Sequence, residues 1–227
     1  MNIVFAYPTG LNPQKGGVER ITDIIAKILL KRGYTIFYLN WKREQDNYEY
    51  PVPVIDLPSS NLEDPNNLEV YNRFLKENRI DVIINQHGLY EGTYFLSQVK
   101  VQNVKIISVL HSDPFGYYNH LFADLMTLRD SSIKEKVKRV ARFFLYRKVK
   151  KIIHRSLVNH YTFIQEHPQY VCLLSESYKE RLEEYCDLPD NYFISIPNPN
   201  TYENIEIIPH KEPILLFVGR LDNRSKK

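Results

Sequence analysis

Pro13-Gln14-Lys15-Gly16-Gly17-Val18-Glu19-Arg20 stands between a short apolar run, Ile3–Tyr7, and a long amphipathic segment. The apolar run is typical of a strand that is buried on both faces of a parallel sheet. Beyond the glycines, apolar residues recur at helical spacing until Gly33, which predicts a left-handed helix end. The stretch therefore predicts a strand, a glycine loop and a helix. Backbone amides at such a loop and the positive end of the helix dipole both favour a bound anion.

Strands and helices are expected to alternate along the rest of the chain. Apolar runs predict strands at 34–40, 52–57, 80–85, 104–110 and at the start of 170–176. The prolines of 52–57 favour a place near a sheet edge. Helices are predicted at 66–78, from a capping box of Asn66 and Glu69, at 91–99, and from Ser177, which is paired with Glu180. The order predicts an α/β fold with a Rossmann-like, doubly wound parallel sheet.

Polar residues gather where the predicted strands finish, at Asn40, Gln86, His87, His111–Asp113, Ser175 and Glu176. In an open parallel sheet these ends share one edge, and the ligand crevice lies there. His111 is either a ligand-contacting residue or a hydrogen-bonded core histidine. Asp113 is its candidate partner, although Asp113-Pro114 is also an ordinary turn opener.

Aromatic residues crowd the segment Phe115-Gly116-Tyr117-Tyr118-Asn119-His120, which is expected to be a loop. Aromatic faces stack on sugar rings and line ligand clefts. Tyr117 and Tyr118, together with His87, are therefore candidate acceptor-binding residues. Ordinary packing is the alternative for all three.

The glycine loop does not fit a dinucleotide. It has no G-x-G-x-x-G, and the second strand closes at Leu39-Asn40 without an acidic residue. P-x-x-G-G-x-E-R directly after the first strand instead resembles the opening of the retaining glycosyltransferases of the GT-B fold, family 4 (group 1). A glycine hinge before a packed helix is the simpler alternative.

Three further stretches resemble the same family, in the family's order. The segment 170–176 is similar to the strand that delivers Ser-Glu to a helix at the interdomain crevice. The segment 192–199 looks like the family's "vIPNG" stretch, with Pro199 in place of the usual glycine, and 213–221 resembles the "fvGRL" first strand of the second domain. The resemblance implies an acceptor-binding domain at 1–208 and the start of a truncated donor-binding domain at 209–227.

The resemblance also implies the reaction: transfer of a sugar from a nucleotide-diphosphate sugar to a glycan or lipid-linked acceptor, with retention and without a required metal or cofactor. Its donor-binding residues map onto Gly16, Gly17, Glu176, Asn198, Arg220 and Lys226, with Arg224 and Lys227 as rivals of Lys226. His111 takes the catalytic position near the donor sugar. Because most of the donor domain is missing, this chain alone is expected to be inactive.

The segment 134–155 is strongly basic. It carries ten Lys and Arg against Glu135 alone, so its net charge is 10 − 1 = +9, in a chain whose total is +3. An apolar stripe at helical spacing predicts a basic amphipathic helix. A solvated charged face is one interpretation, and an anionic membrane surface that bears a lipid-linked acceptor is the other. The candidate membrane contacts are Lys134, Lys138, Arg142, Lys148 and Lys151.

Composition places the chain in a reduced compartment. Its two cysteines, Cys172 and Cys186, lack metal-site spacing, and no signal peptide or membrane-spanning run is evident. A cytoplasmic protein of polysaccharide biosynthesis is expected, with peripheral attachment to the inner face of the membrane as a further hypothesis. Nothing resembles a nucleic-acid module.

Two other functions stay open. The chain could be a non-catalytic module that binds an acceptor glycan or lipid. It could also be part of a GT-B-type sugar-nucleotide epimerase, which would need acidic residues at the crevice, where Asp113 and Glu176 are the candidates.

Overall fold

A computed structural model describes residues 1–42, 47–88, 91–126, 132–167, 169–183, 189 and 192–199. The chain divides into two compact units. The first comprises Met1–Pro114 and Leu157–Pro199, and the described part of the second is 115–126 and 132–156. The expected start of the donor-binding domain at 209–227, with Arg220, Arg224, Lys226 and Lys227, lies outside the described residues.

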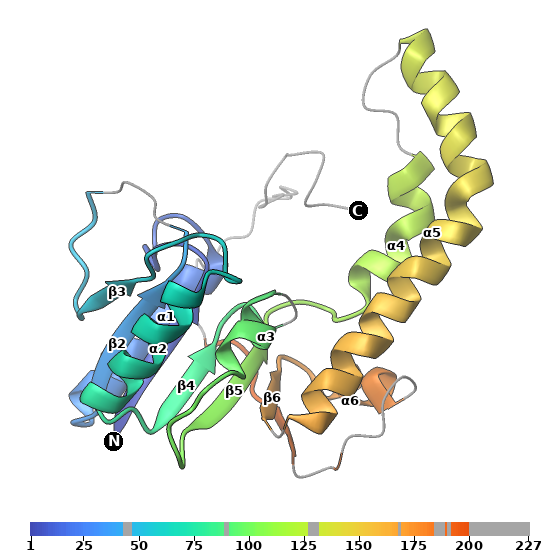
Figure 1. The fold of residues 1–227 in the computed structure, drawn as a ribbon. Coiled ribbons are helices and arrows are strands. Elements are labelled where there is room, and N and C mark those ends of the chain that lie inside the picture. The colour runs from blue at the N-terminus through green and yellow to red at the C-terminus, as the bar shows by residue number, and fades with distance from the viewer. Residues whose placement is uncertain are drawn as a thin grey trace, which may run out of the picture. The chain divides into compact units, whose positions relative to one another are not determined.

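The first unit is built on one parallel sheet (Figure 1). Its strands are β1 (Asn2–Tyr7), β2 (Thr35–Asn40), β3 (Val54–Asp56), β4 (Val82–Asn85), β5 (Lys105–Leu110), β6 (Tyr170–Leu173) and β7 (Phe193–Ser195). They lie in the order β3-β2-β1-β4-β5-β6-β7, and every neighbouring pair is parallel. The strand order reverses beside β1, so the predicted doubly wound sheet is confirmed, as is the edge position of β3.

Helices lie between most successive strands of this unit, although the described residues between β2 and β3 contain none. These helices are α1 (Gly17–Lys31), α2 (Pro65–Glu77), α3 (Glu91–Leu96), the end of α5 (Ile133–Glu166) and α6 (Glu176–Glu183). Gly33 has φ +83°, as predicted for the end of α1.

Two of the predicted helix starts are wrong by one or two residues. Asp64 caps α2, because its carboxylate accepts the Asn66 N–H at 3.0 Å and Pro65 fills the first helical position. The helix α6 begins at Glu176, so Ser177 lies inside its first turn.

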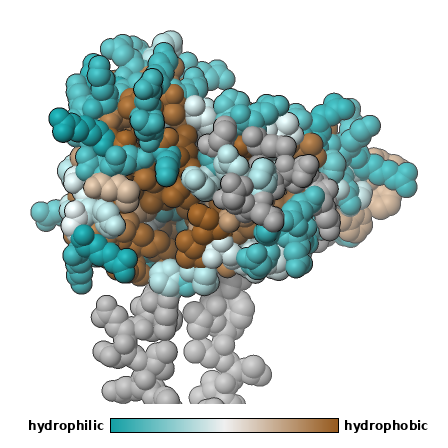
Figure 2. Space-filling view, turned by 90° about the horizontal axis from the view of Figure 1, so that it is seen from below, coloured by the Kyte–Doolittle hydropathy of each residue, from teal (hydrophilic) through white to brown (hydrophobic). Residues whose placement is uncertain are grey.

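The two faces of the sheet are covered unequally. Alternate residues of β1 enter different clusters: Val4 and Ala6 join the side chains of α2 and α3, whereas Ile3 and Phe5 lie on the α1 face. Right-handed crossovers from β3 onward place their helices opposite α1. On that face, Val82 and Ile84 of β4 still pack against the α1 cluster, whereas β5 to β7 lack a described covering helix. Apolar side chains do reach the surface, and Figure 2 shows a continuous apolar area bordered by hydrophilic residues.

The second unit contains α4 (Gly116–Met126) and the first part of α5. The expectation of a loop at 115–120 is wrong. Tyr118, Leu121 and Phe122 share one face of a helix, where Leu121 is fully buried and the rings of Tyr118 and Phe122 contact α5. The expectation of a helix in the basic segment is confirmed, and this helix extends over 34 residues.

Candidate functional site

The candidate site lies in the first unit, at the carboxyl edge of the sheet. Gln86 and His111 directly follow the neighbouring strands β4 and β5. Gln86 Oε1 and His111 Nε2 are within hydrogen-bond distance. The sheet thus brings together two polar residues that are 25 positions apart in sequence.

His111 is largely enclosed. Burial lowers the pKa of His111 from its usual 6.5 to about 4. The imidazole is therefore neutral near pH 7, and can offer a hydrogen bond without carrying charge.

Beside this pair lies a cavity of about 190 Å³. Its walls are apolar side chains from the α1 face of the sheet and from α1 itself, among them Phe5, Ile21 and Cys172. Among the described residues, the polar side chains that line it are those of Gln86, His111 and Asn198. A ligand here would bury an apolar part against the sheet and meet polar groups at the strand ends.

Asn198 reaches the cavity because the chain beyond β7 is held against β6. The Ile196 N–H donates to the Leu173 carbonyl at 2.8 Å, and residues 196–199 then line the cavity. Pro199 also lines it, so the departure from the glycine of the family pattern lies at the cavity wall.

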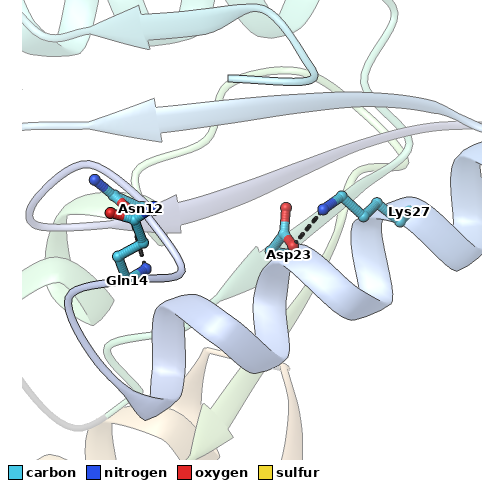
Figure 3. A network of polar contacts seen from close by, with 4 residues as sticks. All are labelled: Asn12, Gln14, Asp23 and Lys27. Carbon is cyan, nitrogen blue, oxygen red and sulfur yellow. Dashed lines mark hydrogen bonds and ion pairs between the residues drawn. The ribbon is translucent and has the colours of Figure 1, made fainter. Parts of the chain in front are cut away.

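The glycine loop is an ordered turn in front of α1. Asn12, which is buried, accepts the Gln14 N–H on its side-chain oxygen at 3.0 Å (Figure 3), and its carbonyl accepts the Lys15 N–H. An Asx turn of this kind fixes the loop before any ligand arrives. Asn12 went unnoticed in the sequence because Asn-Pro alone signals only a turn.

Gly16 and Gly17 occupy the start of α1, but their surroundings differ. A Cβ on Gly17 would meet nothing within 4 Å, so the fold itself does not require glycine there. A Cβ on Gly16 would lie 2.3 Å from Glu19 Oε2. The buried Glu19 carboxylate therefore stands beside the amides that were expected to receive an anion, and opposes a second negative charge.

Glu176 is the first residue of α6 and is exposed. The neighbouring loop after β5 is tied to this helix, because Arg181 Nη1 donates to Asp113 Oδ2 at 2.8 Å. Asp113 therefore links two elements at the carboxyl edge. No local sequence pattern points to Arg181, since its partner is 68 residues away.

The three candidate acceptor-binding residues do not form one described cluster. The His87 ring contacts the rings of Tyr7 and Trp41, each at a centroid distance of 6.1 Å. The backbone N–H of His87 donates to Asn85 Oδ1. Tyr118 belongs to the second unit, where its ring contacts His154 and lies under Lys150 Nζ. The side chain of Tyr117 lies outside the described residues.

Within the described part of the chain, no three His, Cys, Asp or Glu side chains are grouped so that they could hold a metal ion. Within the same residues, every helix is too short or too polar to cross a membrane.

Comparison with known proteins gives one structural likeness to report. A crystal structure of a "putative epimerase" from Burkholderia cenocepacia J2315 is 11% identical to this chain, with a TM-score of 0.33. The match covers 76% of this chain and 52% of that chain, so this chain spans about half of that protein's length. A likeness at this level carries no argument about function. No model of a known protein family matches the chain, and no curated protein does.

Proposed function

We propose that this chain is the acceptor-side half of a glycosyltransferase that uses a nucleotide-diphosphate sugar. The observation that carries the proposal is the Gln86–His111 pair beside an apolar cavity at the carboxyl edge of a doubly wound sheet. Open α/β sheets bind their ligands at that edge, where the strand order reverses. The four stretches that resemble the glycosyltransferase family, in the family's order, indicate sugar transfer as the class of reaction.

In the proposed reaction, the bond from the anomeric carbon to the diphosphate oxygen breaks, and a bond to the acceptor hydroxyl forms on the same face. The acceptor proton passes to the departing phosphate. No protein nucleophile is needed, and the protein contributes positioning and electrostatic stabilisation. The substrate of this reaction is a nucleotide sugar, without a resident cofactor.

His111 and Asn198 would contact the sugar. A glutamine oxygen can only accept, so His111 Nε2 donates to Gln86 and Nδ1 remains an acceptor for a sugar hydroxyl. Within the described part of the chain, no protein group pairs with Nδ1. The cavity volume suits one ring or a short aliphatic segment, since whole ligand pockets are usually several times larger.

The diphosphate would lie between the two halves of the enzyme. Gly17 would approach it from this side. The Glu19 carboxylate beside Gly16 would repel a phosphate placed there, and Glu176 at the start of α6 would face hydroxyl groups of the donor and not its phosphates. Arg220 and Lys226 would clamp the diphosphate from the donor side. A Cβ added at Gly17 would contact no other atom, so packing does not require glycine at this position. Close approach of a ligand to the backbone would explain the glycine, which supports this role.

Product analysis tests the proposal. The chain, and any longer form that its gene encodes, would be incubated with UDP and GDP sugars and with glycan or polyprenyl-phosphate acceptors. Release of nucleoside diphosphate with a glycosylated acceptor is the expected result for the longer form, and His111→Ala should reduce it. Free epimerised sugar without acceptor product would favour the epimerase. Acceptor binding without turnover in the longer form would favour the binding module.

A further inference from the structure

The second unit carries an apolar stripe on the outer side of α5. Its members are spaced as i, i+4, i+7 and i+11, which places them within about 60° of one another around the helix. They remain exposed by 80%, 64%, 59% and 76%, and are Ile133, Val137, Val140 and Phe144. Large apolar side chains are seldom left exposed in a row without a partner.

The inner side of α5 is a different surface. Tyr146 lies about 150° from the stripe around the helix, and its ring contacts Phe122 of α4. Lys150 lies over the ring of Tyr118, also on α4. Packing of α4 therefore accounts for the inner residues and leaves the outer stripe unexplained.

Basic side chains surround the stripe. Lys134, Lys136, Arg147 and Lys148 flank it and are exposed, and Lys151 continues its line two turns beyond Phe144. Two of the basic residues expected at a membrane are excluded from this set. Arg142 is paired with the buried Glu135 at 2.7 Å, and Lys138 lies 4.0 Å from the same carboxylate.

We propose that this stripe and its basic border form a docking surface for an anionic lipid bilayer. The helix would lie in the plane of the interface, with Val140 and Phe144 inserted among the acyl chains and the lysines at the headgroups. The proposal is independent of the glycosyl transfer proposed above, since every residue that carries it belongs to the second unit.

Charge decides between a bilayer and a second copy of this chain. The spacing of the stripe would also suit a helix pair. A second copy, however, would bring one cluster of lysines and arginines against an identical cluster, which is unfavourable. An anionic surface instead complements the net charge of +9 carried by residues 134–155.

Vesicle flotation of the whole chain tests the proposal. We expect binding to vesicles of phosphatidylcholine with phosphatidylglycerol, little binding to phosphatidylcholine alone, and weakening by salt. The triple substitution Lys134→Gln, Lys148→Gln, Lys151→Gln should weaken partitioning by about tenfold or more. The matched control removes three exposed lysines of the first unit: Lys31→Gln, Lys76→Gln and Lys105→Gln. Equal losses in the two triples would overturn the proposal.

The apolar half is tested by Phe144→Gln, with Phe143→Gln as the control about 100° away around the helix. Only Phe144→Gln should weaken binding strongly, and both variants should fold because both rings are exposed. In Phe144→Trp, brominated lipid should quench the fluorescence of the new tryptophan. The native Trp41 is buried, so its own fluorescence should not respond to the lipid. Absence of quenching, equal binding to neutral vesicles, or a dimer that Phe144→Gln dissolves would each overturn the proposal.

Discussion

Gln86 Oε1 accepts a hydrogen bond from His111 Nε2, so that the carboxyl ends of β4 and β5 are joined by a side-chain pair. This bond selects the tautomer of the imidazole and leaves Nδ1 as an acceptor. The orientation of the ring therefore depends on the amide oxygen of Gln86, which accepts and carries no charge.

Gln86→Glu should favour the protonated form of His111. A carboxylate beside the ring favours the imidazolium, so the pKa of His111 should rise from about 4. Histidine NMR signals followed through a pH titration would measure the change. Gln86→Leu is the control, because it removes the partner without adding charge. Similar pKa values in the two variants would contradict the pairing.

Acid should destabilise the first unit through its buried histidines. Burial lowers the pKa values of His111 and His160 to about 4, below the unfolded value of 6.5. Between pH 6.5 and 4 the unfolded chain binds protons that the folded chain does not. The free energy of unfolding should therefore decrease as the pH is lowered from 6.5 to 4, by up to about 1.4 kcal/mol per pH unit for each histidine.

Urea unfolding at several pH values would measure this slope, and above pH 6.5 these two histidines should contribute none. His160→Gln should make the acid slope shallower because one titrating group is lost. A slope unchanged by that substitution would show that other groups cause the acid sensitivity.

Gly17→Ala should show whether Gly17 is required for stability or for ligand binding. Its Cβ meets open space, so the Tm should hold or rise slightly. Nucleotide affinity should nevertheless fall if a phosphate approaches the backbone closely. Gly33→Ala is the matched contrast, because φ +83° should make it cost about 1 kcal/mol of stability. Thermal melts and nucleotide titrations of both variants would distinguish the two roles.

Arg142→Gln should destabilise α5 by about 1–3 kcal/mol, since it leaves the buried Glu135 carboxylate of the same helix without its closest cation. Arg139→Gln is the control, because Arg139 is exposed on the same helix. Helical circular dichroism during thermal unfolding would compare them. Equal melting of the two variants would contradict a structural role for the Glu135–Arg142 pair.

The parallel sheet was predictable because its strands are apolar runs separated by helical crossovers. Local signals sufficed for β1, α1 and Gly33. They failed at α4, where Gly116 and Asn119 suggest a loop, although the helix is held by contacts of Tyr118 and Phe122 with α5. Tertiary packing decided that segment.

The candidate site was only partly predictable. Sequence alone placed Gln86 and His111 at strand ends, because parallel strands finish at one edge. It did not reveal the bond between them, the Glu19 carboxylate beside Gly16, or the Asp113–Arg181 pair. Each of these contacts depends on the side-chain conformations in the folded protein. The periodicity of the sequence does not predict those conformations.

Calorimetric titration of UDP, GDP and their common sugar conjugates into the whole chain tests the central proposal most directly. We predict that one of these nucleotides binds, to this chain or to a longer form that its gene encodes. Gly17→Ala and Arg220→Gln should both weaken that binding. If neither form binds any of the nucleotides, the proposed glycosyl transfer is contradicted, and Gly16-Gly17 is a hinge before α1.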